Sequence, residues 1–386
     1  MKKLAVWILV IGICGLSNSA MAADSGKSFA MAGAFVAVAD DLSAQFYNPA
    51  GLTQVKNRTA GLSLANSSLT LSSPSFPTSY SCSFFNLLEA EALIWPMGEM
   101  VLAVGSETAL DNYFETTETG AGYTSNLKYS DFIYTPGLAL GSELSPNLSL
   151  GLNLSYLLRK GAIDISTSYP PMLMMANIPV EGSSIGATGG LLFKPHSSLS
   201  LGAVIKYLGD VSVSSTWKMT QTGTSDVTGT LSFTEKYPLD FSAGLAFRPE
   251  ENLTLALQAD LINAQDYKIT YVMTGMGAPS TSEIQVKTNS VVGIHAGFEY
   301  LIPAGTGVVP LRAGYFTRPS NTDELVASGG LQPFFNTSTV AVGSGYNAGN
   351  FGVDVGAQFI TMTKNISGTD MTLSDTKILV SSFIKL

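Results

Sequence analysis

The residues of this chain that could carry out chemistry are few and far apart. Of its two histidines, His196 lies in an expected turn and His295 on the polar face of an expected strand. A metal site needs several His, Cys or carboxylate ligands held together, and a hydrolase needs a nucleophile beside an oriented base. The sequence therefore predicts no metal site, no cofactor and no enzyme activity, and it favours a hydrogen-bonded wall position for His295.

A different kind of chemistry, the binding of apolar molecules, is indicated by one segment. Tyr169 to Met175 reads YPPMLMM, although the connection around it is polar. Methionine side chains are unbranched and polarizable, so clusters of them suit varied apolar ligands. The alternative is that the segment only packs over the mouth of the fold. The candidates for ligand capture are Met172, Leu173, Met174 and Met175.

Residues 1–22 predict a signal peptide. Lys2 and Lys3 precede an apolar run from Leu4 to Leu16, and an A-x-A cleavage site ends at Ala22. Loss of the two lysines changes the net charge from −9 to −11, and an acidic chain without a basic patch is not expected to bind nucleic acid. Cys82 is the only cysteine after the leader, so no disulfide can form within the mature chain.

The composition predicts a membrane protein whose apolar surface is spread over strands. Hydrophobic residues make up 45% of the chain and charged residues only 13%, with a mean hydropathy of +0.25. After the leader, no stretch of about 18 apolar residues is available to span a bilayer as a helix. A closed antiparallel barrel solves this problem, because each strand shows lipid one face and every backbone group pairs with a neighbouring strand.

Alternating polarity marks the expected strands. From Leu148 to Leu158 the even positions are apolar, whereas the odd positions up to Ser155 are small or polar. The same alternation recurs at residues 239–247, 253–261 and 351–359. A period of two is that of a strand whose two faces meet different environments.

Short and long connections also alternate, as the periplasmic turns and outer loops of outer-membrane barrels do. Tight turns are expected at 96–98, 145–147, 195–198, 249–251, 303–307 and 347–349, and long polar loops at 67–82, 110–126, 161–182, 210–228, 265–286, 317–337 and 362–372. The fold class is therefore all-β, a transmembrane antiparallel β-barrel of about 14 strands. The expected strands are 58–66, 83–95, 99–109, 127–144, 148–160, 183–194, 199–209, 229–248, 252–264, 287–302, 308–316, 338–346, 350–361 and 373–386.

The segment between the leader and the first strand is expected to form a compact, loop-like hatch inside the barrel, rather than only a turn into the first strand. Phe29 to Leu52 reads FAMAGAFVAVADDLSAQFYNPAGL and has no helical stripe. Pro49 fixes its own φ and biases Asn48 away from the helical region, while Ala50 and Gly51 allow close approach to a wall. We assign gating to these four residues, and we divide the chain into signal peptide 1–22, hatch 23–57 and barrel 58–386.

The Asn48-Pro49-Ala50 triplet, in a small-residue segment ahead of a barrel, resembles the hatch of the FadL-type outer-membrane transport family. The resemblance implies a fourteen-stranded barrel in the outer membrane of a Gram-negative bacterium, which passively transports long-chain fatty acids or other hydrophobic compounds. It further implies that the ligand leaves sideways through a kink in the third strand, here residues 99–109 with Gly105 as the kink candidate, near which we expect the triplet to pack. The implied partners are hydrophobic small molecules and outer-membrane lipid, and a monomer is expected.

Other functions are compatible with the sequence. In a general porin or a structural surface barrel, the hatch segment would only brace the wall, and conductance of small solutes would distinguish the porin. An outer-membrane enzyme is disfavoured because no catalytic set is apparent. The lumen-facing charges are expected to form wall salt bridges: Lys206, Asp240, Arg248, Asp260, Glu299, Arg312 and Asp354.

Overall fold

The computed structural model describes residues 24–72, 80–120, 122–237, 239–264, 266–273, 280–320, 335–366 and 369–386. The predicted signal peptide lies outside these ranges. Three short helical elements come first: α2 (Gly26–Ala30), α3 (Ala44–Tyr47) and the 3-10 helix η1 (Pro49–Gln54). Among the described residues, no helix is long and apolar enough to cross a membrane.

Strand segments make up nearly all of the rest and form a single antiparallel sheet. They are β1 (Thr59–Ser72), β2 (Tyr80–Met97), β3 (Met100–Gly120), β4 (Tyr123–Ser145), β5 (Leu148–Tyr169), β6 (Met172–His196), β7 (Leu199–Leu208), β8 (Val211–Gln221), β9 (Val227–Glu235), β10 (Asp240–Glu250), β11 (Leu253–Ile262), β12 (Asp266–Met273), β13 (Ser280–Lys287), β14 (Val291–Ala304), β15 (Gly307–Arg318), β16 (Asn336–Ala348), β17 (Phe351–Ile366) and β18 (Thr369–Lys385).

Four pairs of these segments are single barrel strands with a short interruption. β7 and β8 are separated only by Gly209 and Asp210, and both pair with β6. β9 with β10, β11 with β12, and β13 with β14 continue one another in the same way. The 18 segments less four continuations give 14 strands, and β1 pairs with both β2 and β18, which closes the barrel. The predicted fold class is confirmed.

Six tight turns lie at one end of the barrel, at the places where the sequence predicts them. Positive φ angles at Gly98, Gly305 and Gly349 allow three of these turns. The backbone N–H of Leu386 donates to the carbonyl of Arg58 at 2.8 Å, so the chain ends beside the start of β1 at this same end. The turns join β2 to β3, β4 to β5, β6 to β7, β10 to β11, β14 to β15 and β16 to β17.

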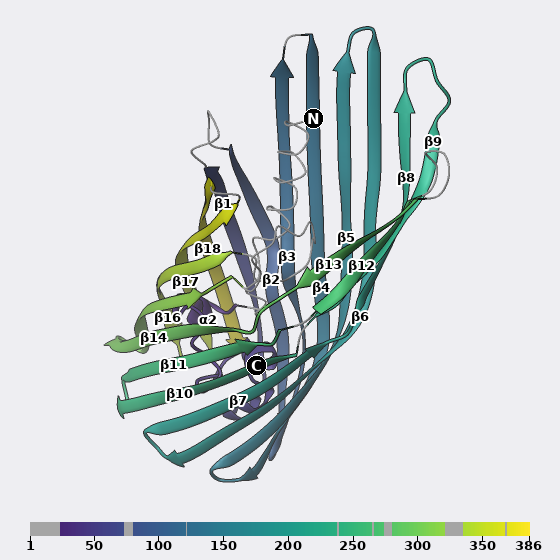
Figure 1. Cartoon of the computed structure of the whole chain (residues 1–386). Coiled ribbons are helices and arrows are strands. Elements are labelled where there is room, and N and C mark those ends of the chain that lie inside the picture. Colours follow the sequence, from purple (N-terminus) through teal and green to yellow (C-terminus); the bar gives the residue numbers. More distant parts are fainter. Residues whose placement is uncertain are drawn as a thin grey trace.

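The opposite end differs from the prediction. Most of the polar segments expected as loops are longer strands: β5 runs to Tyr169 and β6 begins at Met172, so their hairpin extends well beyond β1 and β18 (Figure 1). Hairpins β3–β4 and β17–β18 are extended in the same way. Above the membrane both faces of a strand meet water, so the alternation of polarity disappears while backbone pairing continues.

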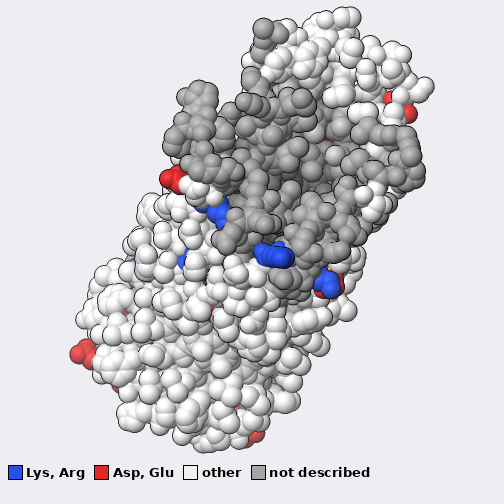
Figure 2. All heavy atoms as spheres, viewed as in Figure 1, with Lys and Arg blue, Asp and Glu red and all other residues white. Residues whose placement is uncertain are grey.

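The wall has an apolar outer face and a small or polar inner face. On β5, Leu152 and Leu154 point outward and are 49% and 52% exposed, whereas Asn153 points inward and is 3% exposed. Charged side chains are rare over the lower half of the visible surface (Figure 2). An apolar band of this kind is the lipid-facing surface of a transmembrane barrel.

A lysine substitution tests directly which side chains of the wall face the lipid. Leu152→Lys places a cation among lipid chains and should destabilise the folded barrel by about 2 to 4 kcal/mol near the midplane. Ser155→Lys on the inner face of the same strand should cost less, because the lumen is polar. The measurement is the fraction of heat-resistant folded barrel on gels. Equal losses for both variants would contradict the assignment of faces.

Candidate functional site: the hatch and the wall around it

The hatch consists of short helical turns instead of the loop-like segment that the sequence predicts. Ser25 caps α2, since its hydroxyl accepts from the Ser28 N–H at 3.1 Å and the Ser28 hydroxyl accepts from the Ser25 N–H at 3.0 Å. α3 ends at Tyr47, the next residue Asn48 has an extended backbone (φ −154°, ψ 99°), and Pro49 starts η1. The predicted interruption at Asn48-Pro49 is confirmed, because the fixed φ of proline suits the first position of a new helix.

Asn48 anchors the hatch. Its side chain is fully buried: Oδ1 accepts from the Ala50 N–H at 3.1 Å, and Nδ2 donates to the carbonyls of Val36 at 2.7 Å and of Leu191 on β6 at 3.0 Å. A buried amide is tolerated when its donors and acceptor are satisfied. One side chain therefore ties together two hatch segments and a barrel strand.

The Asn48-Pro49-Ala50 triplet packs against three glycines of adjacent strands. Gly141 of β4, Gly151 of β5 and Gly190 of β6 lie opposite one another in register. A Cβ at Gly151 or Gly190 would clash with residues of the triplet, so only glycine allows this approach. Gly51 packs in the same manner against Ala39. η1, which contains Pro49 and Ala50, contacts β3 as well as β4, β5 and β6, and α3 also contacts β3. The triplet therefore lies near the third strand as expected, but most of its contacts are with the three strands that follow.

Buried charges join the hatch to β14, β15 and β17. Lys27 of α2 lies 2.8 Å from Glu299 and 3.0 Å from Asp40, and Arg312 bridges Glu299 and Asp354 at 2.7 Å each. Burial alone would lower the pKa of Lys27, but Asp40 and Glu299 outweigh it, so this pKa is raised and the charge is retained. The predicted wall salt bridge of Arg312, Glu299 and Asp354 is confirmed, and a hatch lysine extends it.

Two further wall side chains bind the hatch backbone. Gln258 Oε1 accepts from the N–H groups of Phe35 and Val36, both at 2.9 Å. His295 Nδ1 lies 2.6 Å from the carbonyl oxygen of Ala32, and its Nε2 lies 2.7 Å from Asp260. The predicted hydrogen-bonded wall position of His295 is confirmed. Its role is to hold the hatch.

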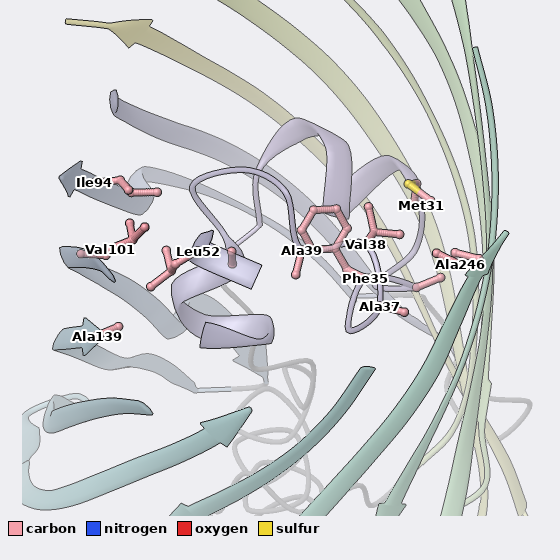
Figure 3. Close-up of a cluster of buried hydrophobic side chains, with 14 residues drawn as sticks. Met31, Phe35, Ala37, Val38, Ala39, Leu52, Ile94, Val101, Ala139 and Ala246 are labelled. Carbon is pink, nitrogen blue, oxygen red and sulfur yellow. The ribbon is translucent and has the colours of Figure 1, made fainter. Parts of the chain in front are cut away.

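An apolar core fills the lumen at this level. Met31, Phe35 and Leu52 of the hatch are fully buried. They lie between Ile94, Val101 and Ala139 of β2–β4 on one side and Ala246 of β10 on the other (Figure 3). Removal of this apolar surface from water stabilises the closed arrangement by about 25 cal/mol per Å².

A strip of small residues crosses the wall from β1 to β4. A Cβ on Gly61 of β1 would clash with Leu42 of the hatch, and a Cβ on Gly105 of β3 would lie 2.8 Å from Gln45 Oε1. Gln45 Nε2 donates to the carbonyl of the β4 glycine at 2.9 Å. The wall here is little more than backbone, and the hatch covers it from within. In register order the strip is Gly61, Ala92, Gly105 and Gly137.

The third strand is irregular just beyond this strip. β3 pairs with β2 only as far as Glu107, whereas its pairing with β4 continues with a register shift between Thr108 and Leu110. Gly105 itself keeps continuous register with both neighbouring strands. The third strand thus carries an irregularity, and the assignment of a kink to Gly105 stays a prediction.

A groove of about 730 Å³ lies on the outer side of the strip, lined mainly by apolar side chains that include Leu62, Leu93 and Ile384. On the inner side a void of about 10 Å³ separates the wall from Phe46 of the hatch. Several residues of β1 and β2 line both spaces. They are Gly61, Leu62, Glu91 and Ala92.

Comparison with known proteins identifies this architecture. No protein-family model and no curated protein matches the chain in sequence. The P. putida toluene transporter TodX matches it in shape with a TM-score of 0.71 at 13% identity, covering 95% of this chain and 99% of TodX. The Ralstonia pickettii toluene transporter TbuX gives 0.67 at 15% identity, covering 95% and 99%, and a Pseudomonas aeruginosa FadL homologue gives 0.69 at 12%, covering 94% and 98%. The chain has the FadL-type fold.

In this FadL-type fold, part of the inner face of the wall is apolar. This part lies farther from the tight turns than Gly151 does. Beside this apolar cluster, Arg159 and Asp131 form a buried two-bond ion pair at 3.0 and 2.7 Å. Sequence reasoning missed the cluster. Its signal is Leu157, an apolar residue at an odd position of a strand whose preceding odd positions, from Ser149 to Ser155, are small or polar. The cluster comprises Ile133, Leu157, Val180, Leu208, Val211, Val213 and Tyr237.

The candidate capture residues lie at the tip of the β5–β6 hairpin. Met172, Leu173, Met174 and Met175 are 47%, 39%, 37% and 48% exposed, so apolar side chains stand on both faces of the strand at this tip. The backbone N–H of Thr222 donates to the carbonyl of Leu173 at 3.0 Å, which ties the tip to the end of β8. Their part in ligand capture stays a prediction.

The histidines are not brought together by the FadL-type fold. His196 is the last residue of β6, beside the expected turn, and its Nδ1 is 2.9 Å from the Ser198 hydroxyl, whereas His295 lies at the hatch. In the part of the chain that the structure describes, no group of three or more His, Cys, Asp or Glu residues could hold a metal ion.

Proposed function

We propose that this chain is a passive transporter of long-chain fatty acids or other hydrophobic compounds, a monomer in the outer membrane of a Gram-negative bacterium, with residues 23–57 as hatch and 58–386 as barrel. The observation that carries the proposal is the apolar groove outside the wall, which a strip of little more than backbone separates from the hatch. For an apolar molecule to pass from the lumen into the membrane, Leu42 to Phe46 would have to move off the strip and the paired strands of the strip would have to part locally.

The proposed path has three steps. The apolar hairpin tip at Met172 to Met175 captures the ligand, the inward-facing cluster around Leu157 receives it, and the strip around Gly105 releases it sideways. Burial of a hydrocarbon tail is favourable by about 0.8 kcal/mol per CH₂, so a single deep site would hold its ligand too tightly. Several shallow apolar sites in series allow net movement down a gradient without a source of energy.

The triplet and its neighbours have different parts in this proposal. Asn48 to Ala50 pack against wall glycines, Gly51 packs against Ala39, and together they hold the hatch in place. Leu42 to Phe46 cover the strip and are the part that moves. A general porin would need an open aqueous path, but buried Met31, Phe35 and Leu52 fill the lumen at hatch level. The names of the structural neighbours, two toluene transporters and a FadL homologue, also support hydrophobic transport.

Filling the outer groove tests the sideways exit. Ala60 faces outward between Leu93 and Ile384, and it lines the outer groove but not the inner void beside the hatch. Ala60→Trp should therefore lower the initial uptake of alkane, toluene or fatty acid by about tenfold, equivalent to about 1.4 kcal/mol in the barrier. Uptake would be measured in a deletion strain that expresses equal amounts of folded barrel.

A matched control is Ala243→Trp, an outward position on β10 remote from the groove. This variant should take up substrate at the normal rate. Normal uptake by Ala60→Trp would rule out exit through the groove, and absence of hydrophobic uptake by the unmodified protein would rule out the transport function itself.

A further inference from the structure

Glu91 is a carboxylic acid on the lipid-facing side of the wall. On β2, Leu93 and Trp95 point outward and are 42% and 40% exposed, while Ala92 and Ile94 are buried, so the alternation places Glu91 outward. Its register partner on β1 is the outward-facing Leu62. An ionisable side chain at membrane depth is costly and indicates a functional site.

Two hydroxyl groups hold this carboxyl group. Ser106 Oγ donates to Glu91 Oε1 at 2.7 Å, and the Tyr134 hydroxyl donates to the same oxygen at 3.0 Å. Ser106 lies directly opposite Glu91 in the β2–β3 register and is only 4% exposed. Both donors use one carboxyl oxygen, and within the described residues no hydrogen bond reaches Oε2. Glu91 Oε2 therefore remains available in the groove as a hydrogen-bond acceptor.

The groove is therefore amphipathic. Glu91, Ser106 and Tyr134 line one part of it, and the remaining lining is mainly apolar, with Leu93 and Ile384 among its residues. This arrangement offers one polar contact and a long apolar surface. It suits a molecule with a hydrocarbon body and a single polar group.

We infer that the groove binds a hydrocarbon that carries a neutral hydroxyl group, with the O–H donating to Glu91 and the chain lying along Leu93 and Ile384. The inference rests on the proposed function, because the groove lies where the ligand would leave the wall. An alkane has no donor for Glu91, and an ionised carboxylate brings only acceptors. An alcohol or an undissociated acid matches the site, and binding there gives the exit a preference among apolar compounds.

Fluorescence quenching tests this selectivity without relying on transport. In a Trp217→Phe background, Trp95 beside the groove is the only tryptophan of the mature chain. Brominated ligands quench tryptophan at short range, so 12-bromododecan-1-ol and 1-bromododecane can be compared in nanodiscs. The alcohol should bind about tenfold more tightly than the alkane, which is the effect of about one additional hydrogen bond. Glu91→Leu should abolish this preference and leave alkane binding unchanged.

The controls separate binding from folding. Glu91→Leu replaces a lipid-facing acid with an apolar side chain, so the barrel should fold at least as well as the unmodified protein. Tyr134→Phe, which removes one hydrogen bond that positions Glu91, should weaken the preference for the alcohol. Tyr156→Phe is the matched control, since Tyr156 is 46% exposed on the outer face of β5 and does not line the groove.

Two results would overturn the inference: equal quenching by both ligands in the unmodified protein, or an unchanged preference in Glu91→Leu. Either result would leave hydrophobic uptake intact. Conversely, a barrel that discriminates between the ligands in nanodiscs but takes up no hydrophobic compound in cells would contradict the proposed function and not the assignment of the site.

Discussion

Removal of residues 24–54 is expected to convert a closed barrel into an ion-conducting one. The hatch fills the lumen with buried side chains such as Phe35 and Leu52, while the wall is closed by strand pairing from β1 to β18 that does not involve the hatch. Without it, water should enter a lumen lined by small and polar residues. Current through a planar bilayer should rise more than about tenfold over that of the full-length protein, and selective uptake of hydrophobic compounds should be lost.

A point variant provides the control for this deletion. Asn48→Leu retains the segment but loses hydrogen bonds to Val36, Ala50 and Leu191 and crowds Gly190, so it should loosen the hatch. We expect a heat-resistant barrel with impaired uptake and intermittent current. A hatch deletion that folds normally, passes no ions and still imports substrate would refute the gated transport function.

Loss of the Arg312 guanidinium is expected to have the largest effect on stability among single substitutions in the wall. Arg312→Met leaves the carboxylates of Glu299 and Asp354 buried without their shared cation, although Lys27 still reaches Glu299. Removal of one partner from a buried ion pair typically costs about 3 to 5 kcal/mol. The measurement is the free energy of unfolding in urea, followed by the loss of the heat-resistant form.

Lys56→Met serves as the comparison, because Lys56 is 65% exposed and pairs with Glu143 at the surface. An exposed pair contributes less than about 1 kcal/mol, so this variant should unfold almost as the unmodified protein does. If both variants lost the same small amount of stability, the network from Lys27 to Asp354 would not be what fixes the hatch to β14–β17.

Part of the candidate site could be predicted from the sequence, because it depends on residues that are close together in the chain. The break at Asn48-Pro49 follows from the fixed φ of proline, and the wall position of His295 follows from the strand pattern around it. The contact of the triplet with β4–β6 could not be predicted. It depends on Gly141, Gly151 and Gly190 standing in one row, which the register of neighbouring strands decides.

The sequence by itself determined the barrel: its alternation, its six short turns and its 14 strands, because strand faces and turns depend on residues close together in the chain. It did not determine where strands end above the membrane, since backbone pairing continues there without an apolar face. Only the tertiary structure decided which residues meet across strands. Glu91, Ser106 and Tyr134 come from three strands, and they form one site because pairing sets them side by side on the same face.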